Sequence, residues 1–448
     1  MVHYNIPDQV SASPSAGEYD IRDALIRRIN SLQSNDVGYL ATYTFSGNTT
    51  NNGAAGPILL AVSNALARGA SITFVIDNAI NPADVWLGTS LQALANRPVN
   101  PLRLVVDNSS GGIMHNKLGI FNVGSTNFWS LVTSWNFTGG ASINQWNMAI
   151  EVNDFDLFRA YTNEMAEFIA GRFHASTNKS HAHDRSTFRL PDDWGTNWVR
   201  FAPYPHASTN NALVDILNVI SNATNEIVFA LNKITRTSVS RALIDAANRG
   251  VRVHGVIPLS DRLTNSNDSF AVFTNLTDLS LYSGSNVVNM LLPFELGKGT
   301  AYDDGSESDL VHSKYMIIDP WTDRGMVIHG SANWTDSALA STSANDENVL
   351  FIRHTGIARA FYAQFRRMNG LTNEFANVWF SGVRAMPAPP EFAFWPIGTN
   401  PYVVEVSSQL PNSNAWTVAY TAGPGGRFSF PLIDNTNSAA LNFRFRSP

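Results

Sequence analysis

The feature that most constrains the fold is an internal repeat, which covers residues 18–77 and 206–258. In each copy, apolar residues at helical spacing are followed by a β-rich run, and a second helix–turn–strand segment comes next. A glycine, Gly69 or Gly250, ends the second helix at the same point of each copy. Strands that alternate with helices predict a parallel-rich sheet covered on both faces. The chain is therefore predicted to contain two α/β halves of related structure.

Polar residues repeat at the same spacing as these elements. MHNKLGIFN holds His115 and Lys117, and VHSKYMIID holds His312 and Lys314. The positions 7, 19 and 21 residues after each histidine are polar in both copies: Asn122, Ser134 and Asn136, and Asp319, Ser331 and Asn333. Chance does not account for agreement at four offsets within halves that are already alike. The repeated polar residues are therefore predicted to share a function.

These residue types suit the cleavage of a phosphodiester. A histidine and a lysine two residues apart on a strand point to the same face. A single His-x-Lys occurrence would be interpreted as a half-buried histidine beside a solvated lysine. Because the pattern occurs twice, a functional site is favoured. A phosphodiester needs a nucleophile, a proton donor for the leaving oxygen and cationic donors for the other oxygens. Two histidines, two lysines and neutral serine and asparagine donors supply them. No carboxylates or histidines have metal-ligand spacing, so the sequence predicts neither metal nor cofactor.

The pattern H-x-K-x4-D followed by G-S-x-N resembles the signature of the phospholipase D superfamily, over roughly residues 18–370. The second copy, HSKYMIID…GSANWT…NDENVLFI, is similar to bacterial endonuclease-like members. The resemblance implies two pseudo-twofold-related α/β/α sandwich halves that share one active site. It also implies a covalent phosphohistidine intermediate, which water or an alcohol then attacks. The residues that match the family pattern are His115, Lys117, Ser134 and Asn136 in the first half, and His312, Lys314, Asp319, Ser331 and Asn333 in the second.

The first half departs from the family pattern in three places. Asn122 stands where the family has an aspartate that is mainly structural, and Thr133 precedes Ser134 in place of a glycine. We assign both residues at the seventh position, and both serines, to supporting the site or binding the phosphate. Family members also carry a downstream acidic residue that orients the histidine of the opposite half. Glu347 in NDEN fits this role, whereas Trp146 stands at the matching place in NQWN.

This difference predicts a division of labour between the two histidines. Glu347 would accept a hydrogen bond from His115 and raise its basicity, which makes His115 the nucleophile and His312 the general acid. Glu347 could instead pair locally with a lysine or arginine, and Asp346 could hold the role in its place. Glu151 could act in the first half, although its apolar setting reads as a strand.

Other signals near the motifs leave alternatives open. Four tryptophans could line a slot for an acyl chain, stack on a base or pack between the halves; they are Trp129, Trp135, Trp146 and Trp334. His181 and His183 resemble a metal pair but lack convergent acidic partners. Asp303 and Asp304 indicate a solvated loop near the entrance, with incidental calcium binding as an alternative. Residues 263–299 have no counterpart in the first half and could form a lid or a substrate-selecting loop.

We predict three domains along the chain. The first phospholipase D-like half would span residues 1–195 and the second residues 196–385. A proline-rich linker would lead to a small accessory β-module at residues 386–448, in which we find no catalytic constellation.

The 448 residues carry a net charge of −6 and include no cysteine, which excludes disulfides and thiolate–metal sites. No apolar run reaches the length of a membrane span, and the N-terminus lacks the order of a signal peptide. We expect a monomer that is secreted or periplasmic, in the form of a mature chain with a new Met1.

Three functions are compatible with these features. The acidic composition and the nearby aromatics favour a phospholipase D that cleaves phospholipid headgroups at a membrane or micelle surface, by hydrolysis or transphosphatidylation. The endonuclease-like second motif favours a nuclease, but the chain lacks the basic excess that binding to long nucleic acid usually requires. A non-catalytic phosphodiester-binding protein would not need both histidines and both lysines. Cardiolipin synthesis and sphingolipid cleavage remain as further phosphodiester reactions.

Overall fold

A computed structural model describes residues 1–5, 19–46, 53–77, 85–124, 126–175, 177, 179–258, 268–283, 286–291 and 310–369, and five strands between residues 391 and 446. The chain separates into a unit of Val2–Asn369 and a unit made of Met1 with Gly370–Pro448. In this described part, no helix combines the length and the apolar character that crossing a membrane requires.

The unit that contains Gly370–Pro448 holds two small antiparallel sheets. Strand β18 (Glu391–Phe394) pairs with β21 (Phe428–Pro431). Strand β19 (Tyr402–Ser407) lies between β20 (Thr417–Ala422) and β22 (Asn442–Arg446). The boundary predicted at residue 386 lies outside the described residues, and the module's role stays a prediction.

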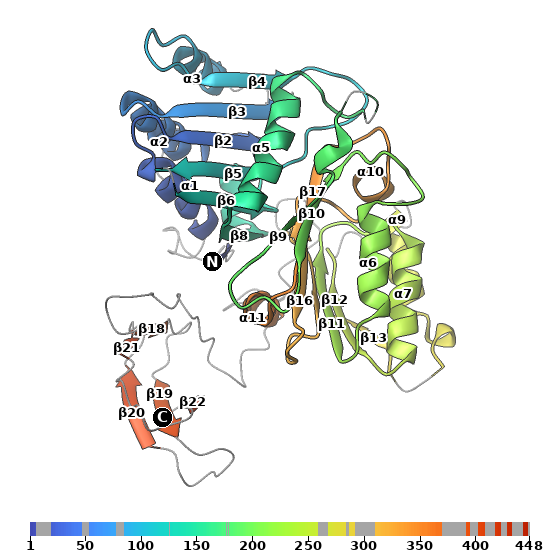
Figure 1. Ribbon diagram of the computed structural model, residues 1–448. Helices are drawn as coiled ribbons and strands as arrows, with labels where there is room; N and C mark the ends of the chain where they lie inside the picture. The colour runs from blue at the N-terminus through green and yellow to red at the C-terminus, as the bar shows by residue number, and fades with distance from the viewer. Residues whose placement is uncertain are drawn as a thin grey trace. The chain divides into compact units, whose positions relative to one another are not determined.

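The first half of the Val2–Asn369 unit is built on a seven-stranded sheet in the order β1-β8-β6-β5-β2-β3-β4. Its strands are β1 (Val2–Tyr4), β2 (Val37–Thr42), β3 (Ser71–Asp77), β4 (Arg103–Asp107), β5 (Leu118–Val123), β6 (Asn127–Thr133) and β8 (Met148–Asn153). Helices α1 (Asp20–Ser31), α2 (Ala55–Ala67) and α3 (Val85–Ala95) cover one face, and α5 (Phe155–Ile169) crosses the other (Figure 1). Two short elements, α4 (Gly139–Ile143) and β7 (Gln145–Trp146), precede β8.

The second half is built on an eight-stranded sheet in the order β13-β12-β11-β15-β16-β17-β10-β9. Its strands are β9 (Arg185–Phe188), β10 (Asn197–Ala202), β11 (Glu226–Leu231), β12 (Arg252–Val256), β13 (Val288–Met290), β15 (Lys314–Ile318), β16 (Met326–Gly330) and β17 (Glu347–Ile352). Helices α6 (Ala212–Ser221), α7 (Thr237–Asn248) and α9 (Asp268–Thr277) pack on one face, and α11 (Thr355–Met368) packs on the other. The short elements are η2 (His181–His183), η3 (Leu279–Leu281), β14 (Leu310–Val311) and α10 (Asp336–Leu339).

The two sheets have the same topology, which confirms the α/β repeat. Strands β10-β17-β16-β15-β11-β12-β13 of the second sheet follow the order of the first, and β9 is an addition at the edge. The expectation of a parallel-rich sheet was wrong in part. Within the two large sheets as described, only β2-β3-β4 and β11-β12-β13 are parallel, whereas the strands after each histidine run antiparallel to their neighbours. Short connections join β5 to β6 and β15 to β16, and such connections make antiparallel pairs.

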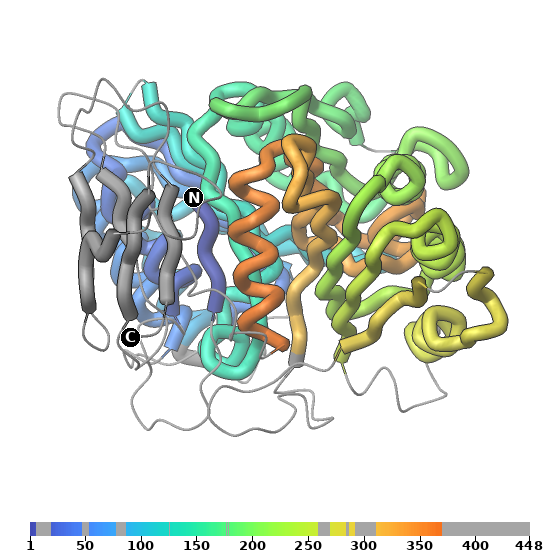
Figure 2. The backbone as a smooth tube through the Cα atoms, turned by 90° about the horizontal axis from the view of Figure 1, so that it is seen from below, coloured from blue at the N-terminus to red at the C-terminus, as the bar shows by residue number. Residues whose placement is uncertain are grey.

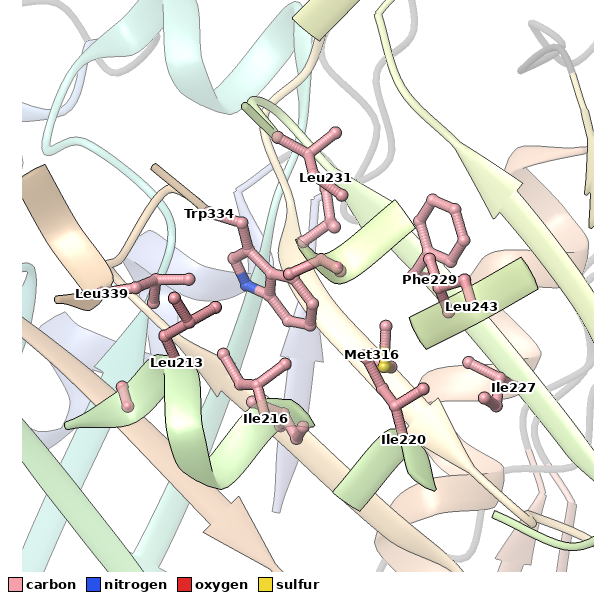
Figure 3. Close-up of a cluster of buried hydrophobic side chains, with 14 of the residues drawn as sticks. Leu213, Ile216, Ile220, Ile227, Phe229, Leu231, Leu243, Met316, Trp334 and Leu339 are labelled. Atoms are coloured by element: carbon pink, nitrogen blue, oxygen red, sulfur yellow. The ribbon is translucent and has the colours of Figure 1, made fainter. Parts of the chain in front are cut away.

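Apolar side chains at helical spacing seal the outer face of the second sheet. Leu213, Ile216 and Ile220 of α6 point toward the sheet residues Phe229 and Met316 (Figure 3). Burial of each such side chain contributes about 1.5–3 kcal/mol relative to exposure. The helix begins at residue 212 because the side chain of the preceding asparagine accepts the Val214 N–H as an N-cap.

A separate apolar core joins the two halves. Leu118 and Val132 of the first sheet and Leu350 and Ile352 of the second belong to one buried cluster. Helix α11 of the second half also contacts β1, so it runs along the seam between the halves (Figure 2). This shared core fixes the start of β5 relative to the start of β15. The two His-x-Lys motifs lie at these strand starts.

Candidate active site

The two predicted histidines enter one site because each is held by the backbone of the opposite half. The His115 N–H donates to the Asp346 carbonyl at 2.9 Å, and Met114 forms a bridge to the same residue. The His312 N–H donates to the Trp146 carbonyl at 3.0 Å. Strand β14, which leads into His312, pairs with β7 of the first half. The imidazoles are close enough for each to sense both lysines electrostatically.

Behind His115 lies a fully buried carboxylate. The His115 Nδ1 atom is 2.7 Å from Oε1 of Glu347, and the Ser331 hydroxyl donates to Oε2 at 2.6 Å. The predicted hydrogen bond across the halves is therefore present, and Glu347 pairs with His115 and not with a local lysine or arginine. An Nδ1–H that donates to Glu347 leaves the Nε2 lone pair free.

Behind His312 lies an amide. The His312 Nδ1 atom is 3.0 Å from Oδ1 of Asn147, which also accepts the Ser134 hydroxyl at 2.9 Å. Asn147 is therefore the counterpart of Glu347, and the alignment of Trp146 with Glu347 was wrong by one residue. Trp146 corresponds to Asp346 instead. The flanking asparagines of NQWN and NDEN suggested a false register, so the sequence alone missed Asn147.

Both lysines are buried, and each donates back to the histidine of its own motif. Lys117 Nζ donates to the His115 carbonyl at 2.9 Å, and Lys314 Nζ donates to the His312 carbonyl at the same distance. Burial lowers the pKa of Lys117 to about 7, although the negative charges of Glu347 and Asp77 act against this. Burial and the charge of Lys117 lower the pKa of Lys314 well below its ordinary range. Two amines held this way favour the entry of an anion, which would restore their charges.

Electrostatics keep both imidazoles neutral. Burial and the two lysines lower the pKa of His115 well below its usual value, and similar causes lower the pKa of His312. Burial raises the pKa of Glu347, while Lys117, Ser331 and Lys314 oppose the rise. Positive charge that develops on the His115 ring, 2.7 Å away, favours the ionised carboxylate. A neutral imidazole is the form that a nucleophilic histidine needs.

Two predicted amide donors occupy equivalent places in the halves. The backbone carbonyls of Asn136 and Asn333 each accept an N–H two residues later, from Thr138 and Thr335. Within the described residues, the buried Oδ1 of either asparagine has no hydrogen-bond partner. An amide oxygen accepts hydrogen bonds, so these atoms would take a donor from a ligand, and the predicted donation by the two amide N–H groups to a phosphate stays a prediction.

The residues at the seventh position do not lie at a phosphate site. Asp319 follows the far end of β15, where its carboxylate accepts the N–H groups of Thr224, Asn225 and Glu226. Asp319 therefore supports the fold, and phosphate binding is the wrong part of its assignment. Asn122 occupies the same end of β5, opposite Val37.

Trp135 and Trp334 pack in the cores of their own halves, whereas Trp146 is buried on β7, which pairs with β14 of the second half. Trp135, Trp146 and Trp334 are almost fully buried, and Trp129 stacks under the Arg28 guanidinium. Figure 3 shows Trp334 among the aliphatic side chains of the second core. The acyl-slot and base-stacking interpretations are therefore wrong for the three buried rings.

The remaining residues that the sequence singled out either have local partners or lie outside the described residues. Glu151 forms ion pairs with Arg28 and His3, so it does not act on His312. His181 pairs with Asp184, and His183 pairs with Glu164, in place of a metal. Most of residues 263–299 is described: α9 packs on α7 and β13 pairs with β12, in the places that α3 and β4 hold in the first half, so the expectation that this stretch has no counterpart was wrong. The Asp303–Asp304 loop lies outside the described residues.

The structure adds residues that sequence spacing did not reveal. Tyr43 follows β2, and its ring meets His115 edge-on, with 5.2 Å between ring centroids. Ligand atoms of Asp77, Asp107 and His174 lie within 4.8 Å of one another, a spacing that a metal ion would fit. His174, however, already bonds to Asp107, so its imidazole acts as the cation there and we assign no metal.

Comparisons with known proteins find similarity to phospholipase D-like proteins. A family model described as "Cardiolipin synthase, PLD-like domain" matches residues 216–369. The mitochondrial cardiolipin hydrolase of Chlamydomonas reinhardtii is 25% identical over 165 residues, which are 37% of this chain and 60% of that protein. This chain therefore matches less than two thirds of that relative's length.

One solved structure shares the fold over most of both chains, and a second is similar in sequence over a shorter stretch. The phosphatidylserine synthase of Haemophilus influenzae Rd KW20 is 12% identical, with a TM-score of 0.51, over 78% of this chain and 85% of that chain. Nuc from Salmonella typhimurium, a phospholipase D family member, is 23% identical over 38% of this chain and 93% of its own, with a TM-score of 0.29. The duplicated motif, the paired sheets and the family match establish that the chain belongs to the phospholipase D superfamily.

Proposed function

We propose that this chain cleaves phospholipids as a phosphodiesterase, with His115 as the nucleophile and His312 as the general acid. The observation that carries the proposal is the unequal support of the two histidines. His115 faces the buried carboxylate of Glu347, whereas His312 faces the amide of Asn147. A carboxylate stabilises the imidazole that gains positive character during attack, and an amide does so less.

In the first step, the Nε2 lone pair of His115 attacks the phosphorus atom and forms an N–P bond. The P–O bond to the leaving alcohol breaks, and that oxygen takes the Nε2 proton of His312. The bound phosphodiester supplies the negative charge that favours a protonated His312, because it offsets the repulsion from the lysines. Lys117 and Lys314 neutralise the non-bridging oxygens, and the free amides of Asn136 and Asn333 offer further polar contacts.

In the second step, His312 takes a proton from water or from an alcohol. The oxygen of that molecule attacks phosphorus, the N–P bond breaks and neutral His115 is restored. Hydrolysis and transphosphatidylation therefore differ only in the acceptor.

The choice of phospholipid rests on two supports. The names of the family model and the curated relative both refer to cardiolipin, a phospholipid with phosphodiester bonds. The net charge of −6 offers no overall attraction for a nucleic-acid backbone. We further propose that the protein works as a monomer, secreted or periplasmic, on lipid at a membrane or micelle surface.

Parallel assays test the proposal. Vesicles of cardiolipin and of phosphatidylcholine, and supercoiled plasmid DNA, are incubated with the full chain in EDTA. We expect lipid cleavage by the unaltered protein and by His181→Ala, whose histidine lies outside the site. We expect His115→Ala to lose activity by roughly 10⁶-fold, the scale for loss of a covalent nucleophile.

Two outcomes would overturn parts of the proposal. Plasmid nicking without lipid cleavage would replace the lipid substrate with a nucleic acid. A trapped phosphoadduct that maps to His312 would reverse the roles of the histidines.

A further inference from the structure

A chain of buried charges lies directly behind the His115–Glu347 pair. We call it the seam network, and its members are Asp107, Glu164, His174, Lys179, His183 and Asp346. His174 bonds through Nε2 to Asp107, and its Nδ1 is 2.9 Å from Oδ2 of Asp346. Lys179 Nζ lies 2.6 Å from the other oxygen of Asp346. The network continues from Lys179 to Glu164 at 2.7 Å.

Asp346 connects this network to the catalytic pair through the backbone. Its carbonyl accepts the His115 N–H, and its own N–H donates to the Ile113 carbonyl at 3.0 Å. Asp77 accepts the Met114 N–H at 2.6 Å on the same stretch. Glu347 is the next residue after Asp346, so the position of Asp346 determines where the Glu347 carboxylate meets His115.

His174 is the cation that lies between Asp107 and Asp346, while Lys179 contacts Asp346 from its other oxygen. Asp77 and Asp107 end the neighbouring strands β3 and β4, and Asp346 approaches from the second half. Burial alone would lower the pKa of His174, but the hydrogen bonds to Asp107 and Asp346 outweigh it and raise this pKa to about 9. Without a cation between them, these buried carboxylates would repel one another.

The backbone also fixes His174 in place. Its φ of 59° lies in the left-handed region, which is uncommon for a residue with a side chain. Gly112 packs against it so closely that a Cβ at residue 112 would lie 2.9 Å from Cγ of His174 and 2.1 Å from the Ala344 carbonyl oxygen. Such a conformation persists only where its surroundings determine it, and it is enriched at functional sites.

Among the residues that the structure describes, the opposite side of the pseudo-twofold axis shows no such network. The counterpart of Asp346 is Trp146, which is buried and carries no charge. The seam network therefore serves the side of the proposed nucleophile and not that of the proposed acid.

We propose that His174 is a positioning residue, which holds Asp346 and thereby keeps Glu347 in hydrogen-bonding register with His115. The inference rests on the proposed function for its kinetic consequence, but its structural consequence can be measured without any substrate.

The variant His174→Gln removes the cation and keeps a polar side chain. His3→Gln is the matched control. His3 lies on β1 and, like His174, is a buried histidine near two carboxylates, which are those of Asp20 and Glu151. Proton NMR of the full chain monitors the downfield Nδ1–H of His115, assigned by its loss in His115→Ala. We expect this signal to disappear in His174→Gln and to persist in His3→Gln.

Single-turnover kinetics on the lipid substrate give the second measurement. We expect formation of the phosphoenzyme to slow about 100-fold in His174→Gln, as for a misplaced catalytic group. KM should change by less than about threefold, because the phosphate-binding lysines keep their places. If the chain proves inactive on lipid, the NMR result still decides the positioning role.

If His174→Gln does not fold, Asp107→Asn weakens the same clamp while Asp346 keeps His174. We expect the His115 signal to broaden or shift in that variant. An unchanged His115 signal in folded His174→Gln or Asp107→Asn, or an equal loss in His3→Gln, would overturn the inference.

Discussion

The two halves present the same frame around different chemistry. In each half, a serine hydroxyl holds a side chain that lies at the start of a strand, behind the histidine of the opposite half. Ser331 holds Glu347, and Ser134 holds Asn147. The group itself is a carboxylate behind His115 and an amide behind His312. Both halves keep the serine that holds the histidine's partner, while the partner itself, which sets the basicity of the histidine, differs between them.

The divergence continues one residue away. Asp346 anchors a buried network of charges, whereas Trp146 packs without one. A duplicated fold can therefore give two similar motifs different roles, because hydrogen-bond partners behind an imidazole decide its tautomer and its proton affinity. The comparison yields three predictions, from the largest expected effect to the smallest.

Exchanging the groups behind the histidines should break the asymmetry. In Glu347→Gln, His115 loses the carboxylate that orients it and stabilises its charge, so we expect kcat to fall by roughly 10³- to 10⁴-fold. In Asn147→Asp, His312 gains a carboxylate but keeps its role, so we expect a change of less than about tenfold. Single-turnover formation of the phosphoenzyme measures both.

Ser331→Ala is the control for the first variant, because it removes the hydroxyl that holds Glu347 but leaves the carboxylate. We expect an intermediate loss. Equal losses in Glu347→Gln and Asn147→Asp would show that the two sides are chemically equivalent and would remove the basis for the assignment.

The two lysines should differ in their response to pH. Burial lowers the pKa of Lys117 to about 7, and burial together with the charge of Lys117 lowers the pKa of Lys314 well below its ordinary range. Lys117 is cationic below its pKa and neutral above it, so affinity for an anion should fall as pH rises through about 7. We expect tungstate, a phosphate mimic, to bind about tenfold more weakly at pH 8 than at pH 6.5, by calorimetry.

Asp77→Asn sharpens this test, because Asp77 raises the pKa of Lys117. The variant should move the transition to lower pH, while Tyr43→Phe should leave it in place. Tungstate affinity that is flat between pH 6 and 8.5 would contradict the expected titration.

The sequence predicted the histidines, the lysines and Glu347 because their spacing is local and occurs twice. The α/β repeat was equally visible, since helical and strand periodicities alternate over short distances. The seam network was not visible, because Asp107, His174 and Asp346 are far apart in the chain and meet only after folding. Asn147 was missed because two asparagines flank the tetrapeptide and either could set the register. The burial of Trp135 and Trp334 could not be read from their position beside the motifs.

The last prediction concerns the seventh position, where the halves differ at the far end of the sheet. Asp319 accepts three backbone N–H groups and the Thr224 hydroxyl, whereas Asp36 supplies the corresponding carboxylate in the first half by accepting the N–H groups of Gln33 and Gly124. Asp319→Ala should therefore lower the free energy of unfolding by about 2 kcal/mol, since the buried Glu226 N–H and two partly buried N–H groups lose their acceptor. Asn122→Ala should lower it by less than about 0.5 kcal/mol. Urea denaturation measures both, and kcat of either folded variant should stay within about twofold of the unaltered protein. A large loss of kcat in a stable Asp319→Ala variant would indicate a catalytic role for this carboxylate. A purely structural residue at the opposite end of β15 from His312 would not cause such a loss.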